Sequence, residues 1–433
     1  MEILAELARR HTSHDGPFLI DGAREIRFYD ILQADDIDLS TIKPGDVVAL
    51  IGDFDPLSVK TMLHLFDRQA IVVPLTVDTR SEHDYFFEAG KVDVVIEGAS
   101  LVRRRDTQAQ NPALDELRQR HLPGLVVFSS GTTGRPKAIL HNVRDLLVRY
   151  EVPRQALRTI NFLFFDHLGG INTLLHTLFN RGVVVNPRER TPQGILEEIE
   201  RHDVELLPTT PTFLRMMLMS GLLDDGFPRC LKLVTYGAER MDSGTLAELV
   251  ALCPNVDFRQ TYGSSEIGVL KIVSRAKDSL WMKICGEGVE TKVVDGVLKI
   301  RSSANRMMAY LDAPSPFDAE GWFDTQDLVD VDGDWIRIVG RTNQVINVGG
   351  LKILPEEIER RALEHEAVLH ADAKGVANPI TGEHIALTCQ LKDGAALDKK
   401  ALKKFLGERL PPTHMPHRIV LRDVAISHRF KKQ

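Results

Sequence analysis

Residues 125–140 read LVVFSSGTTGRPKAIL and place a strand, a polar loop and a lysine in one short stretch. The four apolar residues 125–128 predict a buried strand. The loop after it carries hydroxyl groups and flexible backbone N–H groups, which together can wrap an anion. Lys137 adds a positive charge at the exit of the loop. We therefore predict a phosphate-binding loop made of Ser129, Ser130, Gly131, Thr132, Thr133 and Gly134.

Two other interpretations of this loop must be compared with the first. Runs rich in Ser, Thr and Gly are most often ordinary surface turns. A Walker-type P-loop needs Gly-Lys followed by Ser or Thr at the start of a helix, whereas here Arg-Pro separates Gly134 from Lys137, which excludes it. The stretch instead resembles the SSGTTGxPK signature of the adenylate-forming superfamily. That superfamily contains acyl-CoA synthetases, amino-acid and aryl-acid adenylation domains, and luciferases.

The composition favours a globular protein with small-molecule partners. The 433 residues are 43% apolar and 27% charged, enough for about two to three domains. A net charge of −7 gives no electrostatic basis for nucleic-acid binding. The four scattered cysteines show no zinc or disulfide pattern, so we expect a reducing, cytoplasmic location. Without a run of ~20 apolar residues or a signal peptide, we expect a soluble, unprocessed chain that does not enter a membrane.

Strand and helix patterns alternate before the phosphate loop. Apolar runs at 46–51, 70–75 and 91–96 predict buried strands, and residues 58–67 and 112–120 have helical character. This β-α-β order predicts a parallel sheet with helices on its faces. Short apolar stretches between glycine turns then predict a small β-rich part, and the end of the chain predicts a compact α+β unit.

The resemblance implies a two-domain α/β protein. We place the large, multi-layer domain that binds ATP and the carboxylate, with its parallel sheets and small β-rich part, at residues 1–341. A small, mobile α+β lid would then occupy residues 342–433. Asn343 stands at the family's pivot position and tolerates unusual backbone angles, so we assign it as the hinge. The Gly349-Gly350 pair would let a slender pantetheine arm pass close to the backbone.

Two segments after the loop resemble the parts of the family that bind adenine and metal. Residues 231–239, LKLVTYGAE, predict a strand and a tight turn, and resemble the turn beneath adenine, here Gly237, Ala238 and Glu239. Residues 258–268, FRQTYGSSEIG, resemble the YGxTE motif. The matching residues are Tyr262, Gly263, Ser264, Ser265 and Glu266. The resemblance implies that the tyrosine stacks on adenine, the second serine contacts the α-phosphate, and the glutamate holds Mg²⁺, which favours oxygen ligands.

Three further residues are candidates by their position in such motifs. A histidine beside apolar residues is usually a satisfied core residue, but His167 falls where the family lines its carboxylate pocket. Asp327 lies in GWFDTQD, which resembles the family's GWxxTGD, and its carboxylate suits two ribose hydroxyls. Gln326 replaces the usual glycine of that motif. Arg341 opens a long match to the family's hinge region and would contact ribose or phosphate.

The tail carries the last candidate. An alignment without gaps places Lys432 on the family's adenylating lysine and Lys431 on its usual glycine. A Lys-Lys tail is more often only solvated charge. The catalytic interpretation makes Lys432, Glu266, Lys137 and His167 the groups that act on the reacting atoms.

The resemblance implies a reaction in two half-steps. A small carboxylic acid would react with MgATP to give an acyl-adenylate, and a thiol would then accept the acyl group as a thioester. The acceptor would be coenzyme A or the phosphopantetheine of a separate acyl carrier protein. The alternative class is a nucleotide-binding homologue without ligase activity, favoured by Gln326 and Lys431 in place of glycine.

Overall fold

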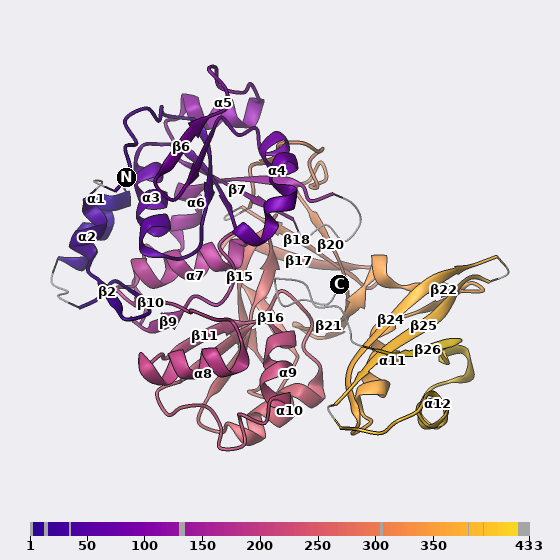
Figure 1. Ribbon diagram of the computed structural model, residues 1–433. Coiled ribbons are helices and arrows are strands. Elements are labelled where there is room, and N and C mark those ends of the chain that lie inside the picture. Colours follow the sequence, from indigo (N-terminus) through magenta and orange to yellow (C-terminus); the bar gives the residue numbers. More distant parts are fainter. Residues whose placement is uncertain are drawn as a thin grey trace.

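The computed structural model describes residues 3–12, 16–33, 36–129, 135–303, 306–379, 381–392 and 394–422. These residues form four β-sheets with helices between and around them, as Figure 1 shows. Three sheets have seven strands each, and the fourth, in the C-terminal part, has five. The α/β class predicted from the sequence is confirmed. In the described part of the chain, no helix is both long and apolar enough to cross a membrane.

The first sheet contains the strand that leads into the phosphate loop. Its strands are β3 (Val47–Ile51), β4 (Ile71–Leu75), β5 (Val94–Glu97), β6 (Ser100–Arg103), β7 (Gly124–Phe128), β8 (Ala138–Asn142) and β19 (Ala309–Tyr310). The order is β19-β8-β7-β4-β3-β5-β6, and β3, β4, β5 and β7 are parallel, as predicted. Both faces are buried, because Leu50 enters one apolar cluster while the adjacent Ala49 enters another. Beside it lie α3 (Pro56–Asp67), η1 (Val77–Glu82), α4 (His83–Ala89) and α5 (Pro112–Gln119).

The second sheet lies across a helical layer from the first. Its strands are β1 (Leu19–Asp21), β2 (Arg24–Ile26), β9 (Arg158–Ile160), β10 (Val183–Asn186), β11 (Leu206–Thr209), β12 (Leu233–Tyr236) and β13 (Asp257–Gln260). The accompanying helices are α1 (Ile3–His11), α2 (Phe28–Leu32), α6 (Val143–Val148), α7 (Leu168–Phe179), α8 (Pro192–Arg201), α9 (Pro211–Met219) and α10 (Ser243–Leu252). The helix α7 lies between the two sheets, and its Leu174 shares one apolar cluster with Val48 of the first sheet and Val184 of the second (Figure 1).

One strand prediction in this region is wrong. The aromatic and apolar side chains within residues 161–170 favour a strand by their pattern, but β9 ends at Ile160. Phe162 and Phe165 instead fill two different apolar clusters from an irregular connection that leads into α7. Burial of the rings therefore does not require the strand conformation that the apolar pattern suggested.

The third sheet is antiparallel and larger than the small β-rich part predicted. It comprises β14 (Tyr262–Ser264), β15 (Gly268–Ser274), β16 (Met282–Cys285), β17 (Val289–Val294), β18 (Val297–Ser302), β20 (Phe323–Asp332) and β21 (Trp335–Arg341). The β17–β18 hairpin turns at Asp295 and Gly296, which both have positive φ, at 51° and 77°. Two positive φ angles are typical of the turn whose twist matches a two-residue hairpin.

The fourth sheet has a core of its own. Its strands are β22 (Ile346–Val348), β23 (Leu351–Ile353), β24 (Val368–Asn378), β25 (Gly382–Leu391) and β26 (Arg418–Leu421). They accompany α11 (Pro355–Leu363), α12 (Lys399–Gly407) and η3 (Pro412–His414), and η2 (Thr342–Gln344) connects them to β21. The apolar cluster includes Ile346, Ile358, Leu387 and Leu402, all from this part of the chain. An independent core is what a separate α+β unit requires.

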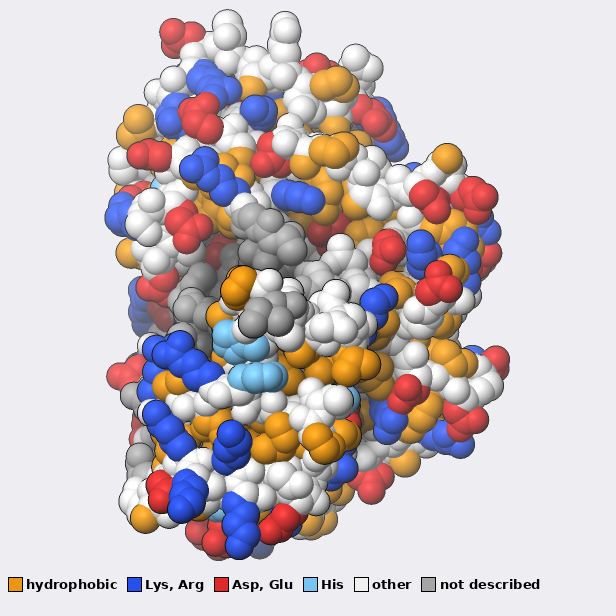
Figure 2. Space-filling model, turned by 90° about the vertical axis from the view of Figure 1, so that its right-hand side faces the viewer, with side chains coloured by type: hydrophobic (Ala, Val, Ile, Leu, Met, Phe, Trp, Pro, Cys, Tyr) orange, Lys and Arg blue, Asp and Glu red, His pale blue; other side chains and the backbone are white. Residues whose placement is uncertain are grey.

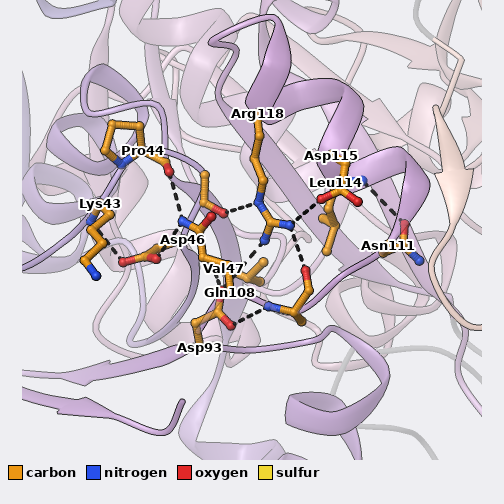
Figure 3. Close-up of polar contacts among 12 residues, drawn as sticks. Lys43, Pro44, Asp46, Val47, Asp93, Gln108, Asn111, Leu114, Asp115 and Arg118 are labelled. Carbon is orange, nitrogen blue, oxygen red and sulfur yellow. Dashed lines mark hydrogen bonds and ion pairs between the residues drawn. The ribbon is translucent and has the colours of Figure 1, made fainter. Parts of the chain in front are cut away.

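A buried polar network fastens the first sheet at the edge remote from the phosphate loop. Asp46 and Asp93, both 0% exposed, directly precede β3 and β5, whereas the loop follows the carboxyl end of β7. Figure 3 shows how they lie against Arg118 and Gln108. Arg118 donates its Nη1 to the carbonyl of Ala109 at 2.7 Å, and Gln108 donates to Asp46 at 2.9 Å. These residues stabilise the fold and lie outside the candidate site.

Candidate active site

The phosphate loop is held at its base by two backbone-anchored hydrogen bonds. The Ser129 N–H donates to the Lys137 carbonyl at 3.0 Å, and the Lys137 N–H donates to Ser129 Oγ at 3.0 Å. Because β7 and β8 pair antiparallel up to this point, the loop is the tip of a hairpin. The predicted phosphate ligands 130–134 lie outside the described residues. Lys137 itself is exposed at the exit of the loop.

Two residues that sequence analysis missed brace this exit. Tyr85 donates its hydroxyl to the Pro136 carbonyl at 2.6 Å, and the Arg135 guanidinium lies 5.2 Å from the Tyr85 ring centroid. Asp312 accepts from the Ala138 N–H at 3.0 Å. Burial, and then the charge of Asp312, raise the pKa of Tyr85, so its hydroxyl remains a donor. No local motif marks these positions, because they lie far from the loop in sequence.

A tyrosine connects the loop lysine to the predicted metal ligand. Tyr310 on β19 donates its hydroxyl to Glu266 Oε1 at 2.8 Å. Lys137 Nζ lies 4.9 Å from the centroid of the same ring, a cation–π distance. Burial, followed by the negative charge of Glu266, raises the pKa of the Tyr310 phenol. The structure thus brings Lys137 and Glu266, which are far apart in sequence, to one side chain.

The donor set around Glu266 fits a hard cation with additional ligands. Its carboxylate is half-buried, and Tyr310 occupies one oxygen. Within the described residues, no group of three or more His, Cys, Asp or Glu side chains could hold a metal by itself. Mg²⁺ commonly takes one or two protein carboxylates and completes its shell with substrate phosphates and water. The residues present therefore fit Mg²⁺ delivered with a nucleotide.

A second cluster gathers three predicted nucleotide ligands. Asp327 is 4% exposed and accepts from the Tyr262 hydroxyl at 2.6 Å on Oδ2 and from Arg341 Nε at 2.8 Å on Oδ1. A carboxylate has about four acceptor positions, so these two bonds leave capacity for hydroxyl donors. Burial, then Asp327, raise the pKa of Tyr262 well above its usual value. The three residues come from β14, β20 and β21 of the third sheet.

The departure from the family pattern beside Asp327 leaves the turn intact. Gln326 has φ of 59°, in the left-handed region that glycine adopts easily. The Asp327 N–H still donates to Thr325 Oγ1 at 3.1 Å, and Thr325 donates to the Leu298 carbonyl at 2.7 Å. Gln326 therefore adopts the left-handed backbone conformation that glycine would adopt, although it carries a side chain.

The predicted adenine turn packs tightly against its neighbour. A Cβ on Gly237 would lie 2.1 Å from Thr261 Oγ1, so this position requires glycine. Ala238 has φ of 65°, and its side chain is exposed. Glu239 accepts from the Thr212 N–H at 3.1 Å and from its hydroxyl at 2.6 Å, which ties the turn to the first turn of α9.

The YGSSE turn is equally constrained. A Cβ on Gly263 would lie 2.2 Å from the Gly268 carbonyl oxygen. The Glu266 N–H donates to Ser264 Oγ at 3.3 Å. Ser265 lies half-buried beside His141 of β8, a residue that sequence analysis did not single out.

His167 begins α7. Its Nδ1 accepts from the Gly169 N–H at 3.0 Å, and the side chain is half-buried. The cap gives His167 a structural role, and its predicted place at the carboxylate pocket stays a prediction.

The predicted hinge and thiol-channel residues lie in and after the connection between the third and fourth sheets. Asn343 is exposed in η2, between the last strand of the third sheet and the first strand of the fourth. Gly349 and Gly350 form the exposed β22–β23 turn, with φ of 58° and 89°. In Figure 1, β22 lies at the outer end of the fourth sheet, away from the other three. Lys431 and Lys432 lie outside the described residues.

The face in Figure 2 is hollowed between an upper and a lower mass of the molecule. Imidazole side chains, in pale blue, gather near this hollow, and lysine and arginine side chains cover much of the lower mass. His384 of β25 and His417, which directly precedes β26, have ring centroids 5.9 Å apart.

Comparisons with curated proteins point to one family. The AMP-binding enzyme family matches residues 39–299 of this chain. 4-Coumarate–CoA ligase 5 from Oryza sativa subsp. japonica is 28% identical over 331 residues, 68% of this chain and 61% of that protein. Acyl-CoA synthetase ALT10 from Alternaria alternata is 25% identical over 361 residues, 71% of this chain and 63% of that protein. The match spans about three fifths of the length of these curated relatives.

Solved structures share the fold over nearly the whole chain. ATP-bound MatB from Rhodopseudomonas palustris has a TM-score of 0.82 at 20% identity, covering 99% of this chain and 97% of that one. The o-succinylbenzoate CoA synthetase MenE from Bacillus subtilis has a TM-score of 0.76 at 19% identity, covering 99% and 96%. At such identities the likeness establishes the architecture alone.

Proposed function

Because the chain belongs to the AMP-binding enzyme family, we propose that it is an AMP-forming ligase that joins a carboxylic acid to a thiol. The observation that carries this proposal is the meeting of predicted site residues from distant segments. Lys137 and Glu266 converge on Tyr310, and Tyr262 and Arg341 converge on Asp327. The names of the relatives, a CoA ligase and an acyl-CoA synthetase, support the same class of reaction.

In the first half-reaction, an oxygen of the substrate carboxylate attacks the α-phosphorus of ATP. The bond to the β-phosphate oxygen breaks, and pyrophosphate leaves with the electron pair. Thr132, Thr133 and Lys137 are proposed to stabilise the departing phosphates, and Ser265 the α-phosphate. Mg²⁺, when bound at Glu266, would neutralise charge on the phosphate oxygens. Lys432 is proposed to stabilise the negative charge that develops between the carboxylate and the α-phosphate.

The nucleoside end would be held by the second cluster. The spare acceptor positions of Asp327 suit the two ribose hydroxyls, and Arg341, which donates to Oδ1, orients that carboxylate. Tyr262 and the Gly237 turn are proposed to enclose adenine. His167 is proposed to border the carboxylate of the substrate, at the start of α7.

In the second half-reaction, a thiol sulfur attacks the acyl carbon, the bond to the AMP oxygen breaks, and the thiol proton passes to solvent. Gly349 and Gly350 form the exposed β22–β23 turn, and they are proposed to line the path of the thiol after the lid has rotated. We propose that residues 342–433 rotate about Asn343 between the half-reactions. Coenzyme A is the acceptor favoured by the relatives' names, and a carrier protein is the alternative.

Pyrophosphate exchange tests this function and identifies the acid. The purified protein is incubated with ATP, Mg²⁺, labelled pyrophosphate and one carboxylic acid from a panel, and label entering ATP is measured. A ligase exchanges label only with its own acid class, and Glu266→Gln, whose fold is checked by thermal melting, should lose that exchange. ATP binding without exchange for any acid would instead support a nucleotide-binding homologue. The glycine-like backbone of Gln326 removes one reason for that alternative.

A further inference from the structure

Tyr310 contacts both charged residues on which the first half-reaction is proposed to depend. It is 9% exposed, its hydroxyl donates to Glu266 Oε1 at 2.8 Å, and its ring centroid lies 4.9 Å from Lys137 Nζ. We propose that Tyr310 is a positioning residue that orients the Glu266 carboxylate toward the metal and keeps Lys137 apart from it. This inference rests on the proposed roles of Glu266 and Lys137.

The backbone fixes Tyr310 relative to both partners. The Met307 N–H donates to the Glu266 carbonyl at 2.8 Å, which joins this segment to the YGSSE turn. On the other side, the Met308 N–H donates to the Leu140 carbonyl at 2.8 Å, and Tyr310 pairs with Ile139 of β8. The backbone around Tyr310 therefore bonds both to β8, which Lys137 directly precedes, and to the turn that carries Glu266.

The ring separates two opposite charges that would otherwise attract each other. Within the described residues, no ion pair within 4.0 Å joins Lys137 to a carboxylate. A direct pair between Lys137 and Glu266 would engage the lysine needed for phosphate and the carboxylate needed for the metal. The aromatic face attracts the ammonium group while the hydroxyl, at the ring edge, binds the carboxylate. One side chain thus holds both charges without letting them meet.

Two substitutions separate the two functions of the side chain. Tyr310→Phe keeps the ring and removes only the hydroxyl, whereas Tyr310→Leu removes the ring as well. ATP affinity is measured by calorimetry with and without Mg²⁺, and the Mg²⁺ dependence of pyrophosphate exchange is measured in parallel. We expect Tyr310→Phe to raise the Mg²⁺ concentration for half-maximal exchange about tenfold, the usual loss when a residue that orients a metal ligand is removed. Its metal-free ATP affinity should stay within about twofold, because the Lys137 contact remains.

Tyr310→Leu should weaken metal-free ATP binding severalfold in addition, since Lys137 can then pair with Glu266. Tyr150→Phe is the matched control: it also removes a buried hydroxyl that donates at 2.8 Å, here to Asn172, remote from these residues. It should lower the melting temperature without changing the Mg²⁺ dependence.

An unchanged Mg²⁺ dependence in Tyr310→Phe, alongside a shift in Glu266→Gln, would overturn the positioning role and leave the proposed function standing. Wild-type ATP binding that does not respond to Mg²⁺ would overturn both.

Discussion

Gln326 places a side chain in a backbone conformation that glycine adopts more easily. Its φ of 59° costs a residue with a Cβ roughly 1 kcal/mol, partly offset by the extra freedom that glycine has in the unfolded chain. We therefore expect Gln326→Gly to raise the free energy of unfolding by about 0.5 kcal/mol, measured by urea denaturation. Gln193→Gly, in the first turn of α8, should lower the free energy of unfolding, because glycine is less favourable in a helix and this position has no strained backbone to relieve. Destabilisation by both substitutions would show that Gln326 contributes contacts that outweigh its strain.

His141 is a buried imidazole whose two ring nitrogens have no hydrogen-bond partner among the described residues. The Ser265 backbone lies close enough to oppose part of the effect of burial on this ring. Burial lowers the pKa of His141 to about 4, against the small opposing effect of Ser265. In the unfolded chain His141 is protonated below about pH 6.5, whereas in the folded protein the ring stays neutral down to about pH 4. Stability should therefore fall as pH decreases through this window, by roughly 3 kcal/mol from this residue.

His141→Leu tests that dependence. Removing a ring without partners should change stability at pH 7 by no more than about 1 kcal/mol, because no hydrogen bond is lost. Between pH 6.5 and 4 the variant should lose less stability than the wild type. Some loss remains, because burial also lowers the pKa of His176 to about 4. Parallel unfolding curves across this window for variant and wild type would show that His141 does not titrate as inferred.

At the scale of elements, the first sheet depends on the network in Figure 3. Asp93 accepts from the Val47 N–H at 2.9 Å and the Ala109 N–H at 3.2 Å, and lies 4.0 Å from the Arg118 guanidinium. Asp93→Ala would leave the two buried N–H groups without their acceptor and remove one of the two carboxylates beside Arg118, so we expect a loss of about 3 kcal/mol in urea denaturation. Asp115→Ala removes a more exposed partner of Arg118 and should cost less than about 1 kcal/mol. Similar losses for both would mean that burial does not distinguish the two carboxylates.

The elements that the sequence predicted well carry their own local signals. Asn142 belongs to the residue types that favour a helix N-cap, and its side chain accepts from the Arg144 N–H at the start of α6. Helix α11 begins at Pro355, as its proline and first-turn acids indicated. The aromatic strand after Ile160 failed because apolar residues also occur in irregular segments that enter a core. Periodicity reports burial, and burial alone does not specify backbone conformation.

At the scale of the whole molecule, the site is assembled by contacts that no local pattern encodes. The resemblance named Lys137, Glu266 and Asp327 separately, but the residues that join them were not predicted. Tyr310 stands between Ala309 and Leu311 in a mostly apolar run of the sequence. The hydroxyl group of Tyr310 in that run could have indicated a polar contact, since a buried tyrosine usually needs a hydrogen-bond partner. The partner could be identified only after β8, β19 and the YGSSE turn were placed together.

The tail is the part of the molecule on which sequence and family pattern differ most. If Lys432 is the adenylating lysine, Lys432→Ala should slow acyl-adenylate formation by about 10² or more, the loss expected when one preorganised charge is removed from a developing anion. Lys431→Ala should have a much smaller effect, because Lys431 falls on the family's usual glycine and not on its lysine. The measurement is the rate of pyrophosphate release in a single turnover.

Thioester formation from a presynthesised acyl-adenylate separates this role from a general defect. Both variants should retain it, because the proposed rotation of residues 342–433 about Asn343 would carry the tail away from the acyl group before the thiol attacks. A variant that fails in both half-reactions would indicate a general defect in the folding or docking of residues 342–433. Its result would then give no support to a catalytic role for the substituted lysine. Equal and small effects of the two substitutions on adenylation would mean that the tail is only solvated charge. In that case the nucleotide-binding alternative would gain support, since no other lysine of the lid matches the family's position.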